Sequence, residues 1–457
     1  MTNLAILTKL DQMDNPTAQL HHWLTQERTF YENHSACNWW KAKAAEAQPY
    51  ASLEAFPGRK SEIYRHTPFP SLLAPLLRTR SSQLQPKRSP SSIEPLPASS
   101  QYGDHLHLYH NHQKEGGSRV PKGISIIPFG EASAGLMKQR IGDLALPKKD
   151  FFVALNMAYL SDGWWLDVAP GTRFDLPLYL HHYTSKLLTH QRLLITMGKG
   201  SSLTLVEYHH HLSPSPAFLN KVTEITLAPS ARLVHHQLPT PSAPSHQLHY
   251  SVVEQAEASR YLHYQLSMGG MLFGHQISTQ LIGARSEASF HGTYLGHNKQ
   301  HFLHHLMAAH QGTSSKSNTR YKGVVSEQSS AAFSGRIAVA QGADQTIASQ
   351  AHHGRQLGDQ ARLYMCPQLA IETNELCCSH GGTISKALPQ EHYYLSSRGI
   401  EPTQAAHLLL KAFLGETLTS IASAQIREEA SKIIEDKLHA LCSNHSIGNL
   451  LAASCKN

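Results

Sequence analysis

Residues His249–Gly296 read HYSVVEQAEASRYLHYQLSMGGMLFGHQISTQLIGARSEASFHGTYLG, a series of short apolar or alternating runs separated by turn residues. Runs rich in Val, Ile, Leu, Tyr, Phe and Thr with such punctuation are typical of β-strands. Similar runs continue from about Ile124 to Ser385, spaced roughly 10–15 residues apart, which leaves no room for a crossover helix between strands. The pattern therefore predicts a mainly β core over residues 123–389 and excludes a parallel α/β fold.

Two architectures fit this core. One is a pair of β-sandwiches, because about 260 residues of short strands is long for a single sandwich. The other is a β-solenoid, in which stacked strand coils bury their inward residues against the next coil. The strand pattern alone leaves both open.

Helical patterns flank the core. Residues 1–80 form a predicted helical N-terminal domain, with Asn15-Pro16 as a helix start. Residues 81–122 are rich in Ser, Pro, Gln and Gly and are predicted to be a flexible linker. Residues 390–457 form a predicted helical C-terminal domain. A helix from about Pro402 has an apolar stripe that either covers the strand stack or binds a partner. The stripe includes Leu409, Leu410, Phe413 and Leu414.

Composition excludes several classes of protein. The net charge is +7 with neutral histidines, but Lys and Arg are scattered, so we expect no nucleic-acid binding. The six cysteines form no CxxC pair or disulfide framework. No apolar run approaches about 18 residues, and the N-terminus does not resemble a signal peptide. We therefore expect a soluble cytoplasmic protein with no membrane partner. The paired histidines are not chelates, because neighbours in a strand point to opposite faces.

The segment Glu375–Ile400, ELCCSHGGTISKALPQEHYYLSSRGI, carries the most specific chemistry. If it is extended, Cys378 and His380 share one face, while Cys377 and Ser379 share the other. A thiolate beside an imidazole suits iron or zinc, but two ligands do not complete a site. The alternative is that Cys378 is an ordinary buried small side chain and His380 a hydrogen-bonded strand histidine.

Three segments carry a resemblance to a known family. They are FSGRIAVAQGADQTIASQ with CPQLAIETNELCCSHGGTISKALPQEHYYLSSRGI, then PGRKSEIYRHTP near the N-terminus, and ALNMAYLSDGWWLDVAPGTRFDLPLYL. Together they resemble the SufB/SufD family of iron–sulfur cluster assembly proteins, and the CSHG segment is similar to the SufD branch. Three features depart from the family pattern: Gly382 stands where alanine is usual, Cys377 where lysine is common, and the stretch Tyr64–Thr67 has Tyr and His where Trp and Tyr are expected.

The resemblance implies a right-handed parallel β-helix flanked by helical domains, which selects the solenoid. It also implies a non-catalytic scaffold subunit that forms a heterodimer with a SufB-like paralogue and binds a SufC-like ABC ATPase. The implied cofactor is a transient iron–sulfur cluster shared with the partner, and some complexes of the family are linked to a reduced flavin.

Residue roles follow from the resemblance in the same way. His380 and Cys378 are expected to support cluster assembly or metal binding at the SufB interface, with ligands from the partner completing the set. The position that resembles the core cysteine of SufB falls near His353. The stripe Leu409, Leu410, Phe413 and Leu414 is expected to bind the ATPase.

The residues also bear on other possible functions. The chain has no GxxxxGK[ST] phosphate loop and no GxSxG elbow, so it is not itself the ATPase or a serine hydrolase of that type. A stand-alone β-helix protein that binds or acts on a carbohydrate is the alternative function. A third reading is a structural paralogue that holds no metal.

Overall fold

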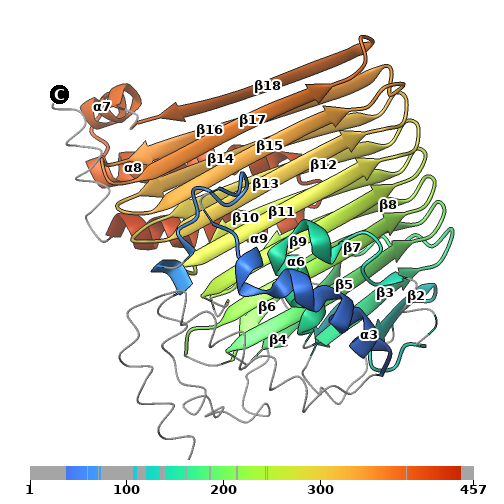
Figure 1. Cartoon of the computed structure of the whole chain (residues 1–457). Coiled ribbons are helices and arrows are strands. Elements are labelled where there is room, and N and C mark those ends of the chain that lie inside the picture. Colours follow the sequence, from blue (N-terminus) through green and yellow to red (C-terminus); the bar gives the residue numbers. More distant parts are fainter. Residues whose placement is uncertain are drawn as a thin grey trace, which may run out of the picture.

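The chain forms a β-solenoid with helices on two sides (Figure 1). The computed structural model describes residues 38–58, 60–69, 71–73, 106–110, 120–133, 135, 140–160, 162–184, 187–212, 215–241, 243, 245–386 and 389–443. Successive strands alternate between two nine-stranded sheets, so each sheet pairs every second strand of the core. This alternation is the topology of a coil, and the double-sandwich alternative is therefore wrong.

The first sheet, sheet A, contains the even-numbered strands from β4 onward, with β1 at one edge. In order they are β1 (Leu106–His110), β4 (Leu178–Thr184), β6 (Ser202–His211), β8 (Arg232–Leu238), β10 (Arg260–Met268), β12 (Glu287–Gly296), β14 (Lys316–Ser326), β16 (Thr346–Leu357) and β18 (Leu376–Ser385).

The second sheet, sheet B, contains the odd-numbered strands from β3 onward, with β2 at one edge. In order they are β2 (Ile124–Pro128), β3 (Asp162–Val168), β5 (Leu188–Met197), β7 (Phe218–Leu227), β9 (His246–Gln255), β11 (Leu272–Leu281), β13 (His301–His310), β15 (Ser330–Val339) and β17 (Arg362–Ile371). All the strand pairs are parallel except β2 with β3.

The two sheets enclose a lumen that is mostly packed with side chains. Alternate residues of each strand point inward, and the apolar ones form a core that includes Leu205 and Ile225 from facing sheets. The register carries one inward row through the turns of sheet A: His235, His263, Phe290, Thr319, Gln350 and His380. The inner wall is thus a ladder of aligned residues that ends at β18.

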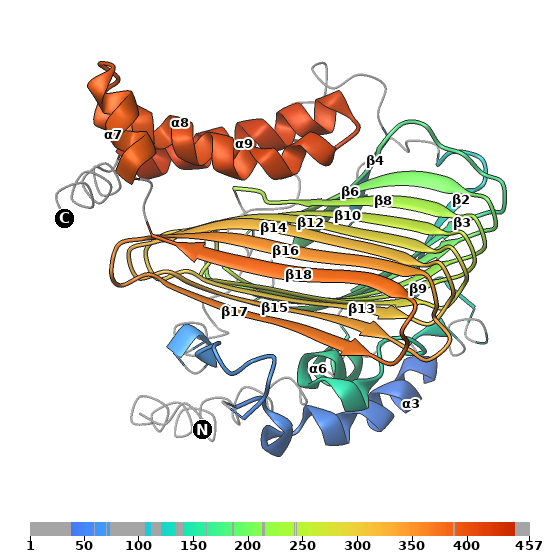
Figure 2. The same cartoon turned by 90° about the horizontal axis from the view of Figure 1, so that it is seen from above.

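Helices cover the outer face of each sheet, as Figure 2 shows. On sheet B lie α3 (Asn38–Ala47), η1 (Gln48–Ala51), η2 (Leu53–Ala55), η5 (Pro147–Lys149) and α6 (Phe151–Ala158). On sheet A lie α8 (Pro402–Gly415), η6 (Glu416–Ser420) and α9 (Ala424–Ser443), which make the apolar contacts, and α7 (Pro389–Ser397) packs against α8.

The mainly β solenoid with flanking helices confirms the predicted fold class. One difference concerns the predicted linker at residues 81–122, because β1 lies within it and pairs with β4. The predicted helix start at Asn15-Pro16 lies outside the described residues. Among the helices that the structure describes, none is long and apolar enough to cross a bilayer.

Candidate functional site

The thiol of Cys378 and the imidazole of His380 lie on β18, the last strand of sheet A. Cys378 pairs with Ala348 and His380 pairs with Gln350 in β16. Ala348 and Gln350 are buried and inward-facing, so Cys378 and His380 share the lumen face. The period-two prediction of a shared face agrees with this register.

Cys378 and His380 differ in exposure. Cys378 is partly buried and packs against a small apolar cluster that includes Ile337 and Ala348, and burial raises the pKa of its thiol. His380 is exposed at the open end of the lumen. A protonated thiol must lose its proton before it ligates a metal, so this pair binds a cation only with proton release.

The neighbouring positions face the opposite way. Cys377 is exposed on the outer face of β18. His353, expected near the site, also faces outward, and its Nδ1 lies 2.8 Å from the hydroxyl of Thr383. Burial is the main cause that lowers the pKa of His353, and the positive charge of Lys322 lowers it further. The structure therefore brings Cys378 and His380 together but places His353 on the other side of the sheet.

Gly382 lies on the same inner face as His380. It pairs with the buried His352, and a Cβ atom at this position would lie 3.0 Å from Met365 Sδ. The glycine that departs from the family pattern thus accommodates the Met365 side chain at the open end.

The end of the solenoid exposes apolar side chains around this pair. Strands β17 and β18 are each the last strand of their sheet in the part of the chain that the structure describes. Leu369, Ile371 and Ile384 are 38%, 42% and 46% exposed. Open strand edges and clustered apolar side chains are features of a surface that another chain covers.

The pair does not by itself form a metal site. In the described part of the chain, the one group of three ligands with metal-binding spacing is His182, Glu207 and His209, which lies inside the solenoid. Cys378 and His380 therefore offer two donors, and a four-ligand site there needs donors from elsewhere.

The helix stripe predicted to bind the ATPase divides into two parts. Leu410 and Leu414 are fully buried and pack with α9 and the outer face of sheet A. Phe413 is partly buried beneath Lys322 and Arg355, which stack on its ring. Leu409 is partly buried, whereas Leu408 is 43% exposed. The buried half of the stripe covers the solenoid, and a partner can reach only the outward half.

Sequence reasoning missed the relation between His380 and the inward row of sheet A. The row members follow one another at intervals of about one coil, so His235, His263 and Gln350 stand in line with His380. Each side chain lies one turn of the solenoid from the next. Aligning the sequences of successive coils of the solenoid can reveal this row, whereas the segment around Cys378 and His380 alone cannot.

Comparison with known proteins identifies a family. Residues 181–413 match the family model described as "SUF system FeS cluster assembly, SufBD core domain". The chain is 28% identical over 290 residues to an iron-sulfur cluster assembly SufBD family protein of Synechocystis sp. (strain ATCC 27184 / PCC 6803 / Kazusa), covering 61% of this chain and 64% of that protein.

Two further relatives have more specific names. The "Iron-sulfur cluster assembly protein SufD" of Escherichia coli (strain K12) is 25% identical over 295 residues, 63% of this chain and 70% of that protein. "Protein ABCI7, chloroplastic" of Arabidopsis thaliana is 24% identical over 405 residues, 84% of this chain and 83% of that protein. The family model covers half of the sequence. The chain therefore belongs to the SufBD family of iron–sulfur cluster assembly proteins.

Proposed function

We propose that this chain is a SufD-like scaffold subunit that assembles iron–sulfur clusters together with a SufB-like paralogue and a SufC-like ATPase. The observation that carries the proposal is the placement of Cys378 and His380 on the lumen face of the terminal strand β18. A half-site of soft ligands at an open end suits a cluster whose other ligands come from a second chain.

The paralogue is the partner for the open end. A solenoid of similar cross-section can continue the two sheets at β17 and β18 and cover Leu369, Ile371 and Ile384. Such a contact places the Cys378 and His380 side chains inside the interface. The iron–sulfur cluster is then cargo that forms between the chains and leaves again.

The ATPase is assigned to the outward face of α8 and α9. The inner faces of these helices are already packed on sheet A, so the docking residues include Leu408 rather than Leu410. In this proposal the chain is a scaffold that is not itself catalytic, and the ATPase provides the free energy of ATP hydrolysis. The reduced flavin stays a prediction that rests on the resemblance.

The cysteines indicate the cellular compartment in which we expect the protein. Cys366, Cys377 and Cys378 are all free thiols in the described part of the chain, which suits a reducing compartment such as the cytoplasm. Family membership disfavours the alternative of a carbohydrate-acting solenoid, because the matched residues 181–413 belong to the cluster-assembly core.

The test measures cluster assembly by the co-expressed complex. His380→Ala and Cys378→Ala are expected to leave the complex intact and to lower cluster content, measured as bound iron and visible absorbance. Cys377→Ala is the matched control, because it removes the neighbouring thiol from the outer face. Normal cluster content in both His380→Ala and Cys378→Ala, with the complex intact, would reject the proposed site and favour a purely structural subunit.

A further inference from the structure

Three basic side chains lie together on the outer face of sheet A, near its last coils. Arg320 and Lys322 belong to β14, and Arg355 belongs to the neighbouring strand β16. The register pairs Lys322 with His353, two residues before Arg355. Because alternate residues of a strand share a face, all four side chains leave the sheet on the same side. We call Arg320, Lys322 and Arg355 the basic cluster.

Contacts with helix α8 and strand β18 hold two members of the basic cluster in place. The Lys322 ammonium lies 4.6 Å from the centroid of the Phe413 ring, and the Arg355 guanidinium lies 5.0 Å from the same centroid. Arg355 also donates through Nη1 to the hydroxyl of Ser385 at 2.5 Å. Lys322 is only 6% exposed. The aromatic ring shields one side of these cations from water, which strengthens their interaction with an anion.

The basic cluster has more positive charge than its protein surroundings neutralise. Lys322 donates to the carboxylate of Glu416, the first residue of η6, which is itself 56% exposed. Among the residues that the structure describes, neither Arg320 nor Arg355 has a carboxylate within ion-pair distance. Three cations beside one carboxylate leave two positive charges without a countercharge.

The basic cluster acts on two neighbouring titratable groups. The hydrogen bond from Lys322 is the main cause that lowers the pKa of the Glu416 carboxyl, and the charges of Lys322 and Arg320 lower it further. Burial lowers the pKa of His353 most, and the charges of the basic cluster add to that effect. Both shifts have the direction that a positive potential produces. Such a potential attracts anions to this part of the surface.

We propose that the basic cluster binds a phosphate group, held over His353 between Lys322, Arg355 and Arg320. Guanidinium and ammonium groups make short, charge-assisted hydrogen bonds to phosphate oxygens. The two unmatched positive charges also suit a phosphate dianion. The site lies on the outer face of sheet A, whereas Cys378 and His380 face the lumen, and it does not depend on the function proposed for that pair.

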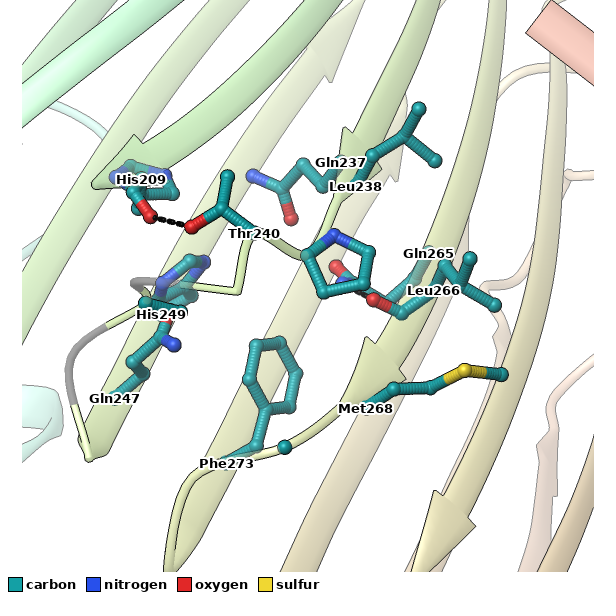
Figure 3. Close-up of a pocket in the computed structure, with 13 residues that line it drawn as sticks. His209, Gln237, Leu238, Thr240, Gln247, His249, Gln265, Leu266, Met268 and Phe273 are labelled. Atoms are coloured by element: carbon teal, nitrogen blue, oxygen red, sulfur yellow. Dashed lines mark hydrogen bonds between the residues drawn. The ribbon is translucent and has the colours of Figure 1, made fainter. Parts of the chain in front are cut away.

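A pocket at the ends of β8 and β10 is a second place where an anion could approach a buried cation (Figure 3). His209 and His249 line it, and the Lys221 ammonium lies 3.4 Å from Nε2 of His209. The charge of Lys221 is already matched by Glu207, and the lining includes no Lys or Arg. This pocket therefore has no excess positive charge, and we assign the anion to the basic cluster instead.

The first test locates the anion. Crystals of the full chain are soaked in arsenate, which has the shape and charge of phosphate, and anomalous difference maps are recorded on both sides of the arsenic edge. The proposal expects a peak between Lys322 and Arg355. Peaks confined to other surface cations, a peak only in the pocket of Figure 3, or no peak at all would overturn it.

The second test measures the affinity for inorganic phosphate by titration calorimetry. Arg355→Gln and Arg320→Gln each remove a charged hydrogen-bond donor, so each should weaken binding by about 10- to 100-fold. Arg285→Gln is the matched control, because it removes the same charge from an exposed pair with Glu257. Equal weakening in Arg285→Gln would show that binding follows net charge alone and would contradict the assignment.

A third variant should change the affinity in the opposite direction. Glu416→Gln removes the carboxylate that competes for Lys322, so phosphate should bind more tightly, by up to about fivefold. Weaker binding in Glu416→Gln would contradict the proposal, because it would mean that Glu416 supports the site. Melting curves must show each variant folded, and Lys322→Met replaces Arg355→Gln if the latter does not fold.

Competition identifies the source of the phosphate group. Displacement of inorganic phosphate by ADP would assign the site to the phosphates of a nucleotide, whereas phosphate binding that ADP does not affect would assign it to the free ion. Both results support recognition of phosphate. Acetate that displaces phosphate at equal concentration would overturn the proposal, because the cluster would then suit the carboxylate side chain of a protein partner.

Discussion

The ammonium of Lys221 lies 2.5 Å from Glu207 Oε1 inside the solenoid, and both side chains are fully buried. The two residues come from facing sheets, β6 and β7. Burial alone raises the pKa of the Glu207 carboxyl, but Lys221 and His235 overcome that effect and hold the pKa well below its usual range. The pair therefore joins the two sheets through a buried, charged contact across the lumen.

Breaking this pair should destabilise the protein strongly. Glu207→Gln leaves the Lys221 charge buried without its partner, so we expect the free energy of unfolding in urea to fall by about 3–5 kcal/mol. The double variant Glu207→Gln/Lys221→Met removes both charges and should recover most of that loss. Glu257→Gln, which breaks the exposed pair with Arg285, is the control and should change stability little. Equal effects of the two single variants would contradict the buried-pair argument.

Acid should unfold the protein well above pH 3. Burial lowers the pKa of His249, His304 and His352 to about 3 and that of His310 to about 4. Unfolded histidines have a pKa near 6.5, so between pH 6.5 and 3 the unfolded chain binds more protons. Unfolding free energy should thus be constant for these groups above pH 6.5. It should fall below that pH by about 1.4 kcal/mol per pH unit for each histidine.

Urea titrations at several pH values measure this effect. The slope of unfolding free energy against pH counts the protons taken up, and several protons are expected between pH 6 and 5. A stability that stays flat from pH 7 to pH 5 would show that the interior histidines are not buried in neutral form.

A hydroxyl secures the N-terminal segment to the solenoid. Tyr64 donates to Asp150 Oδ2 at 2.6 Å and accepts from Gln276 of β11. Asp150 in turn caps α6 through the backbone N–H of Phe152 and Val153. Tyr64→Phe should lower unfolding free energy by about 1–3 kcal/mol, because it leaves a buried carboxylate oxygen unsatisfied. Tyr50→Phe, at an exposed tyrosine, should have no comparable effect in the same melting experiment.

The strand pattern predicts the mainly β architecture because every coil repeats the same arrangement of short strands and turns. Apolar residues recur at alternate strand positions and turns carry Gly or Ser, so the sequence indicates a mainly β core, although the resemblance was needed to choose the solenoid. The shared face of Cys378 and His380 follows from period two alone. In contrast, the pairing of Glu207 with Lys221 is not readable, because it depends on how two sheets meet across the lumen.

Helix α8 shows a second limit of sequence reasoning. An apolar stripe has the same spacing whether it packs internally or binds a partner. Leu410 and Leu414 are internal, and only the structure distinguishes them from Leu408.

The open end of the solenoid should be required for assembly with the paralogue. Ile371→Arg puts a charge among the exposed apolar side chains at the end of β17, and we expect it to abolish co-purification of the SufB-like chain. The protein itself should remain folded, because Ile371 is 42% exposed. Leu408→Arg, equally exposed but on α8, is the control and should leave the heterodimer intact. A heterodimer that survives Ile371→Arg would place the interface elsewhere.

The two sides of α8 should respond differently to mutation. Leu410→Ala removes a fully buried side chain between α8, α9 and sheet A, so unfolding free energy should fall by about 2–5 kcal/mol. Leu408→Glu changes an exposed position and should leave the melting temperature unchanged while it weakens co-purification of the ATPase. Lys411, which pairs with Glu435 on the exposed side of the same helices, offers a second test through Lys411→Glu. If both surface variants retain the ATPase, the enzyme docks on another surface, and α8 serves only to cover the solenoid.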